Sequence, residues 1–292
     1  MVPPLPNPDR SRRTTLRSLH RLLFLSLAGL SAVGAEAGPW AAGKGHSYFK
    51  LSFQHLGSRK LVAPDGTRFV IPLFTREEVS LFGLIGLSKD WTMVASIPLL
   101  RSSDLRDSPD ELRRESGFGD VQLGIQRQLG TASGWVFAAR GTLQFPTGDV
   151  DRAQGLLPTG SGIYEGDVVF EAGRSIGAGG RGWMFVGAGP QFRGGGLRDG
   201  LVFGGQVGWK TSETLAFMAS SRGVEPFSHD APKTARGSFA GVGDRVAYVV
   251  FGPSVLWNVT KRSGLQFDAE FVAYARNLAS GPVFRLGYFL TR

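Results

Sequence analysis

The sequence predicts an all-β fold: a single closed antiparallel up-and-down transmembrane β-barrel of about twelve strands, preceded by a cleavable signal peptide. Three observations lead to this prediction. Polar and apolar residues alternate over long segments, short and long connections alternate along the chain, and tryptophans gather at one end of the segments. A tilted strand needs about 9–11 residues to cross a bilayer, whereas strands of soluble proteins average about 5–6.

The first 37 residues have the pattern of a secretory signal peptide. Five arginines lie between Arg10 and Arg21, the apolar run 22–37 follows, and it ends in the small-residue pattern Ala35-Glu36-Ala37. A short membrane anchor is the alternative, but the run is short and ends in small residues. We therefore expect cleavage before Gly38, with a signal peptide over 1–37 and a barrel domain over 38–292. The full chain has a net charge of +9, and residues 1–37 contain five basic and two acidic residues. Removal of this leader leaves a net charge of +6 for the barrel domain.

Twelve segments of the remaining chain have the two-residue period of β-strands. No apolar stretch reaches the roughly 18 residues that a membrane-spanning helix requires, so such a helix is not expected. The predicted strands cover 46–55, 77–87, 90–99, 118–129, 134–145, 163–176, 182–193, 200–209, 213–222, 245–257, 262–274 and 282–291.

The segment 117–129 illustrates the alternation. Val121, Leu123 and Ile125 fall on one parity, while Gln122 and Gln126 fall on the other. Most of the other strands alternate in the same way. Three segments alternate too weakly for their faces to be assigned, and these are 77–87, 182–193 and 245–257.

The connections and the tryptophans distinguish the two ends of the predicted barrel. Long loops, such as 56–76, 100–117, 146–162 and 222–244, alternate with tight turns, which is the layout of outer-membrane barrels. Five tryptophans lie where a strand meets a tight turn. Because indole rings favour the headgroup level of a membrane, we predict interface anchors at this end. The predicted anchors are Trp91, Trp135, Trp183, Trp209 and Trp257.

Ionic side chains in the middle of strands predict which parity faces inward. A Lys or Arg at the lipid midplane of such a barrel costs about 2–4 kcal/mol, so the apolar parity is expected to face lipid and the ionic parity the lumen. The carboxylates of one strand are expected to pair with Arg140 and its neighbours across the lumen. The candidate lumen-lining residues are Lys50, Gln122, Gln126, Arg140, Gln144, Glu165, Asp167, Glu171, Lys210, Asp268 and Glu270.

The sequence offers little for catalysis or for cofactors. There is no cysteine, and the barrel domain has only His46, His55 and His229. His55 precedes Ser58, but no third group is visible to orient a base. The loop carboxylates Asp149 and Asp151 lack the spacing of a calcium loop. We therefore expect no enzymatic activity, no catalytic residues, no metal and no cofactor.

Three short motifs resemble a known family. The segments "GFGDVQLGIQRQL" (117–129), "LQFPTGD" (143–149) and "LPTGSGIYEGDVVFEAGRS" (157–175) are similar to exported proteins that are proposed to be transporters of the phenol meta-degradation pathway. The resemblance is clearest over 117–176. It implies an outer-membrane barrel that passes small compounds, hydrophobic or aromatic ones among them, and it brings no catalytic residues.

We therefore expect a channel or transporter in the cell outer membrane, where small solutes diffuse passively through a narrow charged lumen. Its expected partners are outer-membrane lipid and lipopolysaccharide, the solute, and the barrel-assembly machinery during insertion. Nucleic acid is not expected, because no compact Lys/Arg cluster occurs. There are two alternatives to a channel. One is a non-conducting structural or surface-binding barrel, and the other is an outer-membrane lipid hydrolase that uses His55 or His229.

Overall fold

A computed structural model of the chain describes residues 38–106, 112–151, 156–228, 230 and 240–292. The chain divides into two units, Met1–Ala35 and Glu36–Arg292, and the description below concerns the second. The predicted signal peptide and His229 lie outside the described residues. Among the described residues, no helix is long and apolar enough to cross a membrane.

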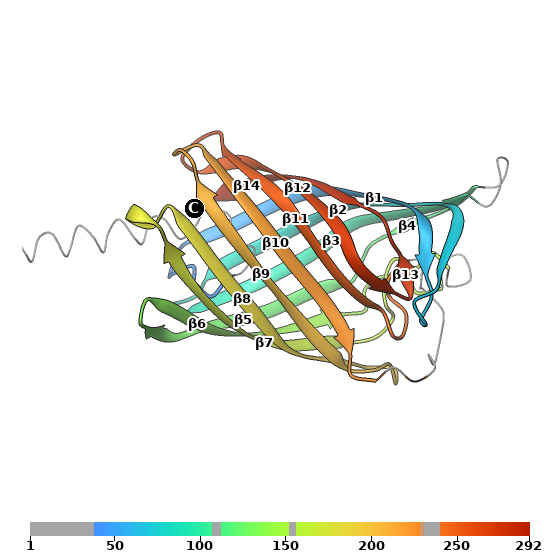
Figure 1. Ribbon diagram of the computed structural model, residues 1–292. Helices are drawn as coiled ribbons and strands as arrows, with labels where there is room; N and C mark the ends of the chain where they lie inside the picture. Colours follow the sequence, from blue (N-terminus) through green and yellow to red (C-terminus); the bar gives the residue numbers. More distant parts are fainter. Residues whose placement is uncertain (1–37, 107–111, 152–155, 229, 231–239) are drawn as a thin grey trace, which may run out of the picture. The chain divides into compact units, whose positions relative to one another are not determined.

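Twelve antiparallel strands close into a single barrel (Figure 1). Each strand pairs with its neighbours along the chain, and β1 completes the barrel by pairing with both β2 and β14. The strands are β1 (Ser47–Val62), β2 (Arg68–Gly86), β3 (Trp91–Arg106), β5 (Val121–Ala132), β6 (Trp135–Phe145), β7 (Glu165–Ile176), β8 (Gly182–Arg193), β9 (Gly200–Lys210), β10 (Leu215–Pro226), β11 (Ala247–Asn258), β12 (Ser263–Arg276) and β14 (Val283–Thr291). All twelve predicted strands are therefore confirmed.

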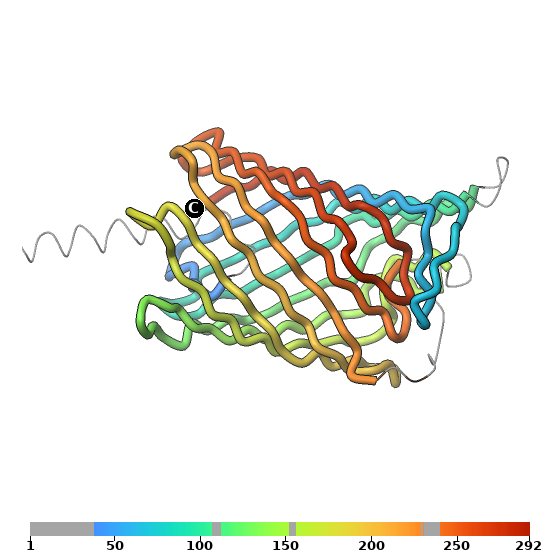
Figure 2. The backbone as a smooth tube through the Cα atoms, in the orientation of Figure 1, coloured from blue at the N-terminus to red at the C-terminus, as the bar shows by residue number. Residues whose placement is uncertain are grey.

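Two short strands and one 3-10 turn complete the described structure. β4 (Leu112–Gly117) pairs with β3, and β13 (Leu278–Ala279) pairs with β1. The 3-10 turn covers Ala178–Gly180 between β7 and β8. The tube in Figure 2 shows the strands inclined to the barrel axis, as closure of a sheet into a barrel requires. We call the end with the tight turns the short-turn end and the opposite end the long-loop end.

The strands at the long-loop end extend further than the sequence predicts. The predicted loop 56–76 is mostly a hairpin, since β1 runs to Val62 and β2 begins at Arg68. Likewise β3 continues to Arg106 and pairs with β4 within the predicted loop 100–117. The backbone pairing of the strands continues there, but polar residues such as Arg59 and Lys60 are exposed. Apolar residues therefore no longer occur at every second position there, and the strand prediction depended on that pattern.

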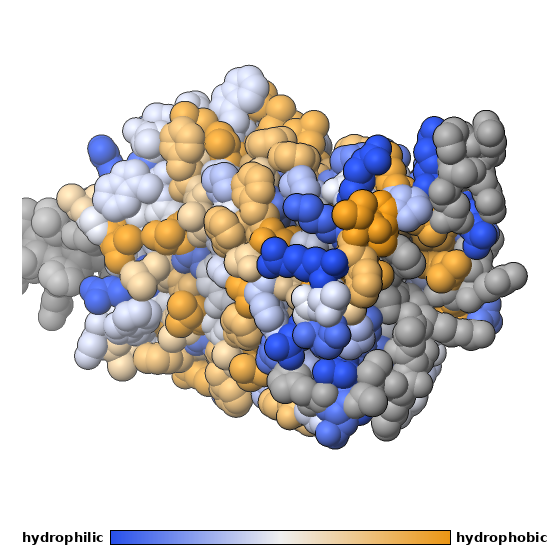
Figure 3. All heavy atoms as spheres, turned by 45° about the vertical axis from the view of Figure 1, so that its right-hand side comes forward, coloured by the Kyte–Doolittle hydropathy of each residue, from blue (hydrophilic) through white to orange (hydrophobic). Residues whose placement is uncertain are grey.

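Side chains alternate between an exposed outer face and a shielded inner face. On β1, Phe49, Leu51 and Phe53 are exposed, whereas Lys50 and Ser52 are buried. Apolar side chains cover most of the visible outer surface in Figure 3, and strongly polar ones gather toward its right-hand part. The exposed apolar side chains include Leu123, Ile125, Leu143, Phe170, Val207, Phe217, Phe267, Phe271, Leu286 and Leu290.

The structure also decides the three faces that the sequence leaves open. Phe82 of β2 and Phe185 of β8 line the interior, whereas the Phe251 side chain of β11 is on the outer face and is 51% exposed. Glycine interrupts the alternation of polar and apolar residues in β8 and β11. At these glycines the backbone of the neighbouring strand approaches closely. A side chain at Gly189 would collide with the carbonyl oxygen of Val168.

Candidate functional site

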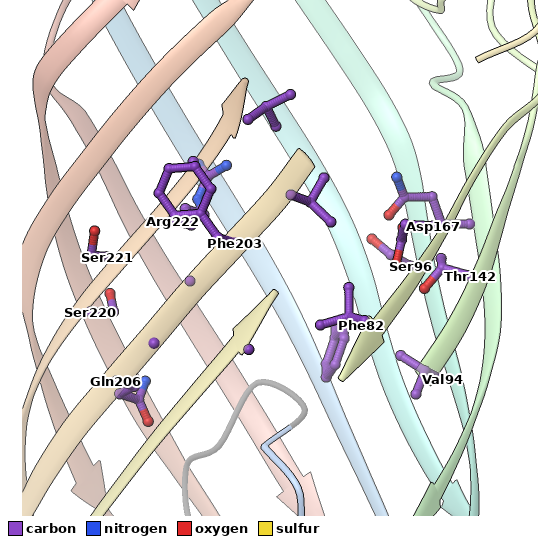
Figure 4. A pocket seen from close by; sticks show the side chains of 18 of the residues that line it. Phe82, Val94, Ser96, Thr142, Asp167, Phe203, Gln206, Ser220, Ser221 and Arg222 are labelled. Atoms are coloured by element: carbon purple, nitrogen blue, oxygen red, sulfur yellow. The ribbon is translucent and has the colours of Figure 1, made fainter. Parts of the chain in front are cut away.

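The centre of the barrel contains a cavity of about 560 Å³. In Figure 4, Phe82, Val94 and Asp167 lie on one side of this space, and Gln206 and Arg222 lie on the other. The wall carries ionic groups of both signs together with apolar ones. Its charged residues are Lys50, Glu78, Arg140, Asp167, Glu171, Arg222, Glu270 and Arg285.

Ion pairs along the wall keep these charges compensated. Arg140 Nη1 lies 3.2 Å from Glu171 Oε1, and Arg222 Nη2 lies 2.8 Å from Glu270 Oε2. Arg285 lies 3.8 Å from both Asp268 and Glu270. Buried carboxylates are costly unless they are paired, which explains why each of these lies beside a guanidinium group. The wall is therefore charged locally while positive and negative groups remain close together.

A second cavity of about 350 Å³ lies next to the central one. Arg101 and Arg193 line it, and each forms an ion pair, at 2.7 Å with Glu78 and at 2.8 Å with Glu165. The two cavities share five lining residues, so they lie directly beside each other in the barrel interior. The shared residues are Glu78, Ser96, Gln122, Arg222 and Tyr248.

The segment 156–164 folds into the barrel at the long-loop end. Leu157 is fully buried in an apolar cluster with Phe74, Leu105 and Ala279. Arg101 Nη1 donates a hydrogen bond of 2.7 Å to the carbonyl oxygen of Thr159. This described part of the connection between β6 and β7 is therefore packed against the inner wall rather than extended into solvent.

Asp120 fastens this segment. Its carboxylate accepts hydrogen bonds from the backbone N–H groups of Gly148 at 2.9 Å and Ser161 at 2.6 Å, and from the Gln144 amide at 3.2 Å. A side chain at Gly160 would collide with the same carboxylate. Asp120 is the aspartate of the Gly-Phe-Gly-Asp motif, so the motif that carries the family resemblance has a structural role here.

The segment 240–246, which precedes β11, also lies inside the long-loop end of the barrel. Arg76 Nη1 donates to the carbonyl oxygen of Ala240 at 2.7 Å, and Arg193 Nη1 donates to that of Gly243 at 3.2 Å. Asp244 is fully buried and forms an ion pair with Arg198. Arginines of the barrel wall thus hold the carbonyl groups of this connection.

Residues 38–42 enter the barrel at the short-turn end. Gln126 Nε2 donates a hydrogen bond of 2.8 Å to the carbonyl oxygen of Gly38, and the N–H of Ala42 donates to Thr92 Oγ1 at 2.9 Å. The Trp40 ring meets the Phe185 ring edge-on at 6.4 Å between centroids. Phe185 lines the central cavity, so this segment packs against one of the residues that form the cavity wall.

The predicted lumen residues occupy several depths of the interior. Lys50, Gln122, Arg140, Asp167, Glu171 and Glu270 line the central cavity, and Gln122, Gln144 and Glu165 line the second. Gln126 holds residues 38–42, and Asp268 accepts a hydrogen bond of 2.8 Å from Gln266. Lys210 is half-buried at the end of β9 and lines neither cavity.

Sequence reasoning missed most of the arginines of the interior. Arg76, Arg101 and Arg193 lie outside the predicted strands or at the end of a weakly alternating one, where parity gives no assignment. Arg222 and Arg285 lie on the parity opposite to the apolar residues of their strands, so the alternation would have found them. The charged inward-facing residues that were missed are Arg76, Glu78, Arg101, Asp120, Arg193, Arg222 and Arg285.

The tryptophans of the short-turn end do not all face outward. Trp91, Trp209 and Trp257 are exposed, and Trp135 is partly exposed with Arg174 over its ring. Trp183 is only 9% exposed, and its Nε1–H donates to Gln206 Oε1 at 3.0 Å. Its assignment as an interface anchor needs correction. The Trp183 indole ring points inward and lies against Gly208, where a side chain would collide with the ring.

The residues considered for catalysis are not assembled into a site. His55 Nδ1 lies 3.3 Å from Glu77 Oε1, and both side chains are exposed. Ser58 instead donates its hydroxyl to the carbonyl oxygens of Lys60 and Ser280. Within the described part of the chain, no three His, Asp or Glu side chains are grouped as a metal site would require.

The fold is that of outer-membrane β-barrels. An outer membrane channel from Pseudomonas putida F1, the COG4313 channel, superposes with a TM-score of 0.60 at 17% identity, covering 89% of this chain and all of that one. The NanC porin superposes with a TM-score of 0.50 at 10% identity, covering 83% of this chain and 98% of that one. No protein-family model and no curated protein matches the sequence. At these identities the likeness establishes the fold.

Proposed function

We propose that this protein spans the outer membrane and lets small solutes cross by passive diffusion through its charged lumen. The observation that carries the proposal is the contrast between the two faces of one sheet. The outer face exposes many large apolar side chains, while the inner face lines two adjacent cavities with paired ionic groups. Exposed apolar surface of this extent on a closed barrel fits a lipid environment.

Location and partners follow from the same reasoning. The fold is shared with an outer membrane channel and a porin, which supports the outer membrane as the location. Export through the signal peptide over 1–37, insertion by the barrel-assembly machinery, and contact with lipid and lipopolysaccharide are parts of this proposal. The exposed Trp91, Trp209 and Trp257 support a membrane interface at the short-turn end.

The wall of the central cavity favours small solutes with some apolar surface. Phe82, Val94, Val169 and Phe185 contribute apolar side chains between the ion pairs. A solute with an aromatic or aliphatic part can contact these groups while its polar atoms face the charged groups. This chemistry agrees with the solutes that the family resemblance implies.

Reconstitution of the purified protein tests the proposal. In planar bilayers we expect discrete current steps, and in liposomes we expect uptake of small sugars, amino acids or aromatic acids. Liposomes that contain the heat-denatured protein provide the background. An absence of both current and uptake, with a folded barrel confirmed by circular dichroism, would refute the channel.

A non-conducting barrel is the second candidate, and one observation favours it. The lumen is narrowed from both ends, by residues 38–42 at one end and by the segments 156–164 and 240–246 at the other. If these segments stay in place in the membrane, the interior serves as a packed support for surface loops. The conductance measurement separates this candidate from the first.

A further inference from the structure

Arg76 of β2 differs from the other arginines of the second cavity. Its Nη1 donates a hydrogen bond to the carbonyl oxygen of Ala240. Its Nε and Nη2 atoms are shielded from solvent and have no hydrogen-bond partner among the described residues. Arg76 also lines the 350 Å³ cavity. Its Nε and Nη2 atoms are covered on the cavity side as well, so a ligand in the cavity reaches them only when the side chain turns toward it.

The carboxylates that line the same cavity are already engaged. Glu78 pairs with Arg101, Glu165 pairs with Arg193, and Asp120 accepts two backbone N–H groups. No ion pair joins Arg76 to a carboxylate of the described residues; Glu78, which lines the same cavity, has Arg101 as its ion-pair partner. Leaving donors of a charged group unsatisfied in a shielded place is costly, and an incoming acceptor removes this cost.

We propose that the second cavity is a binding site for a small organic carboxylate, with Arg76 as its principal ligand; this inference rests on the proposed function. A guanidinium group presents parallel N–H donors that match the two oxygens of a carboxylate. The wall of this cavity is mostly polar, and Pro98, Val242 and Tyr248 provide its few apolar contacts for the remainder of the solute. The cavity volume lies in the range of ordinary small-molecule sites.

The position of the site gives it a role in passage. Arg76 donates a hydrogen bond to the segment 240–246 at the long-loop end, and the second cavity lies beside the central one. A carboxylate that enters from the long-loop side meets Arg76 before it reaches the central ion pairs. The site would therefore concentrate anionic solutes at this end of the lumen.

Calorimetric titration of the detergent-solubilised full barrel with benzoate tests the site. We expect Arg76→Gln to weaken benzoate binding about tenfold or more, because a charged hydrogen-bonded pair is lost. Arg76→Lys keeps the positive charge but loses the pair of parallel N–H donors, so we expect a smaller loss of benzoate affinity. Arg59→Gln removes an equal charge from an exposed position of β1 that lines neither cavity, and it should leave binding unchanged.

Benzyl alcohol, which is neutral and of similar size, should bind equally to the wild type and to Arg76→Gln. The inference is wrong if the wild type does not bind benzoate, or if Arg76→Gln and Arg59→Gln bind it equally well.

A parallel liposome assay with a neutral pentose keeps the two proposals apart. Pentose uptake together with benzoate binding that ignores Arg76 would overturn the site and leave the channel standing. Benzoate binding that depends on Arg76, without pentose uptake or current, would support the site and overturn the channel.

Discussion

Arg140 and Glu171 show how a single charge is tolerated on the inner wall. The Glu171 carboxylate is almost completely buried, and the guanidinium group of Arg140 is its ion-pair partner. Each group compensates the other, so the pair is tolerated where either charge alone would be costly. The same reasoning applies to Arg222 with Glu270, although the Arg222 side chain is half exposed and its pair is therefore weaker.

Removing one partner of the first pair should destabilise the barrel. We expect Arg140→Gln to lower the free energy of unfolding by about 2–3 kcal/mol, because Glu171 stays buried without its guanidinium partner. Denaturant unfolding in detergent or liposomes measures the change. The double variant Arg140→Gln with Glu171→Gln should recover most of the loss. If the double variant is as unstable as the single one, the pairing has no protective role.

At the scale of elements, the connections of the barrel are held by side chains of the wall. Asp120 binds two backbone N–H groups of the connection between β6 and β7, and Gln126 binds the carbonyl oxygen of Gly38. These contacts place polypeptide inside both ends of the lumen. The space that remains inside the barrel is thus limited by segments that lie outside the twelve strands.

Asp120→Ala should loosen the segment 156–164. It removes the acceptor of the N–H groups of Gly148 and Ser161, while Leu157 remains in its apolar cluster. We expect faster proteolysis within 146–164 and little change in the barrel itself, measured by limited proteolysis and circular dichroism. Asp120→Asn retains one acceptor oxygen and should be cut at an intermediate rate. Equal rates for all three proteins would contradict the fastening role.

Deletion of residues 38–45, with the leader 1–37 kept, should widen the short-turn end. The deletion removes Trp40 from beside Phe185 and frees the amide of Gln126. We expect larger single-channel currents in planar bilayers than for the full chain. Trp40→Ala is the milder variant, and it should give a smaller increase. Currents unchanged by the deletion would show that the constriction lies elsewhere.

At the scale of the whole molecule, one sheet separates two environments. Closure through β1 and β14 joins the two ends of the sheet, so each of the twelve barrel strands has a partner on both sides. The outer face is apolar and the inner face is ionic, the reverse of a soluble protein with a dry core. This arrangement is stable only where lipid or detergent covers the outer face.

Two substitutions at a similar height along the barrel axis test which face of the sheet contacts lipid. Leu286 of β14 is exposed on the outer face, whereas Ser80 of β2 lines the central cavity. We expect Leu286→Arg to lower the free energy of unfolding in liposomes by about 2–4 kcal/mol. Ser80→Arg should change stability little, because its side chain meets a polar interior, and it should reduce current. Equal destabilisation by both would argue against a lipid-covered outer face.

The sequence by itself determined the twelve strands, their antiparallel order and the outward face of most of them. Lipid accepts only apolar side chains on the outer face, so the two-residue period is strong along each strand, as in 117–129. The same period predicted the interior position of Glu165, Asp167 and Glu171. These are local properties, because each depends only on the parity of positions within one strand.

Only the tertiary structure decided what fills the lumen and how its charges are arranged. The inward turn of Trp183, the contact of Gly38 with Gln126 and the unsatisfied donors of Arg76 join residues that are distant in sequence or lie on different strands. The barrel interior accepts apolar, polar and charged side chains alike, so it imposes no period on the sequence. Its contents are fixed by which strands face each other across the closed barrel.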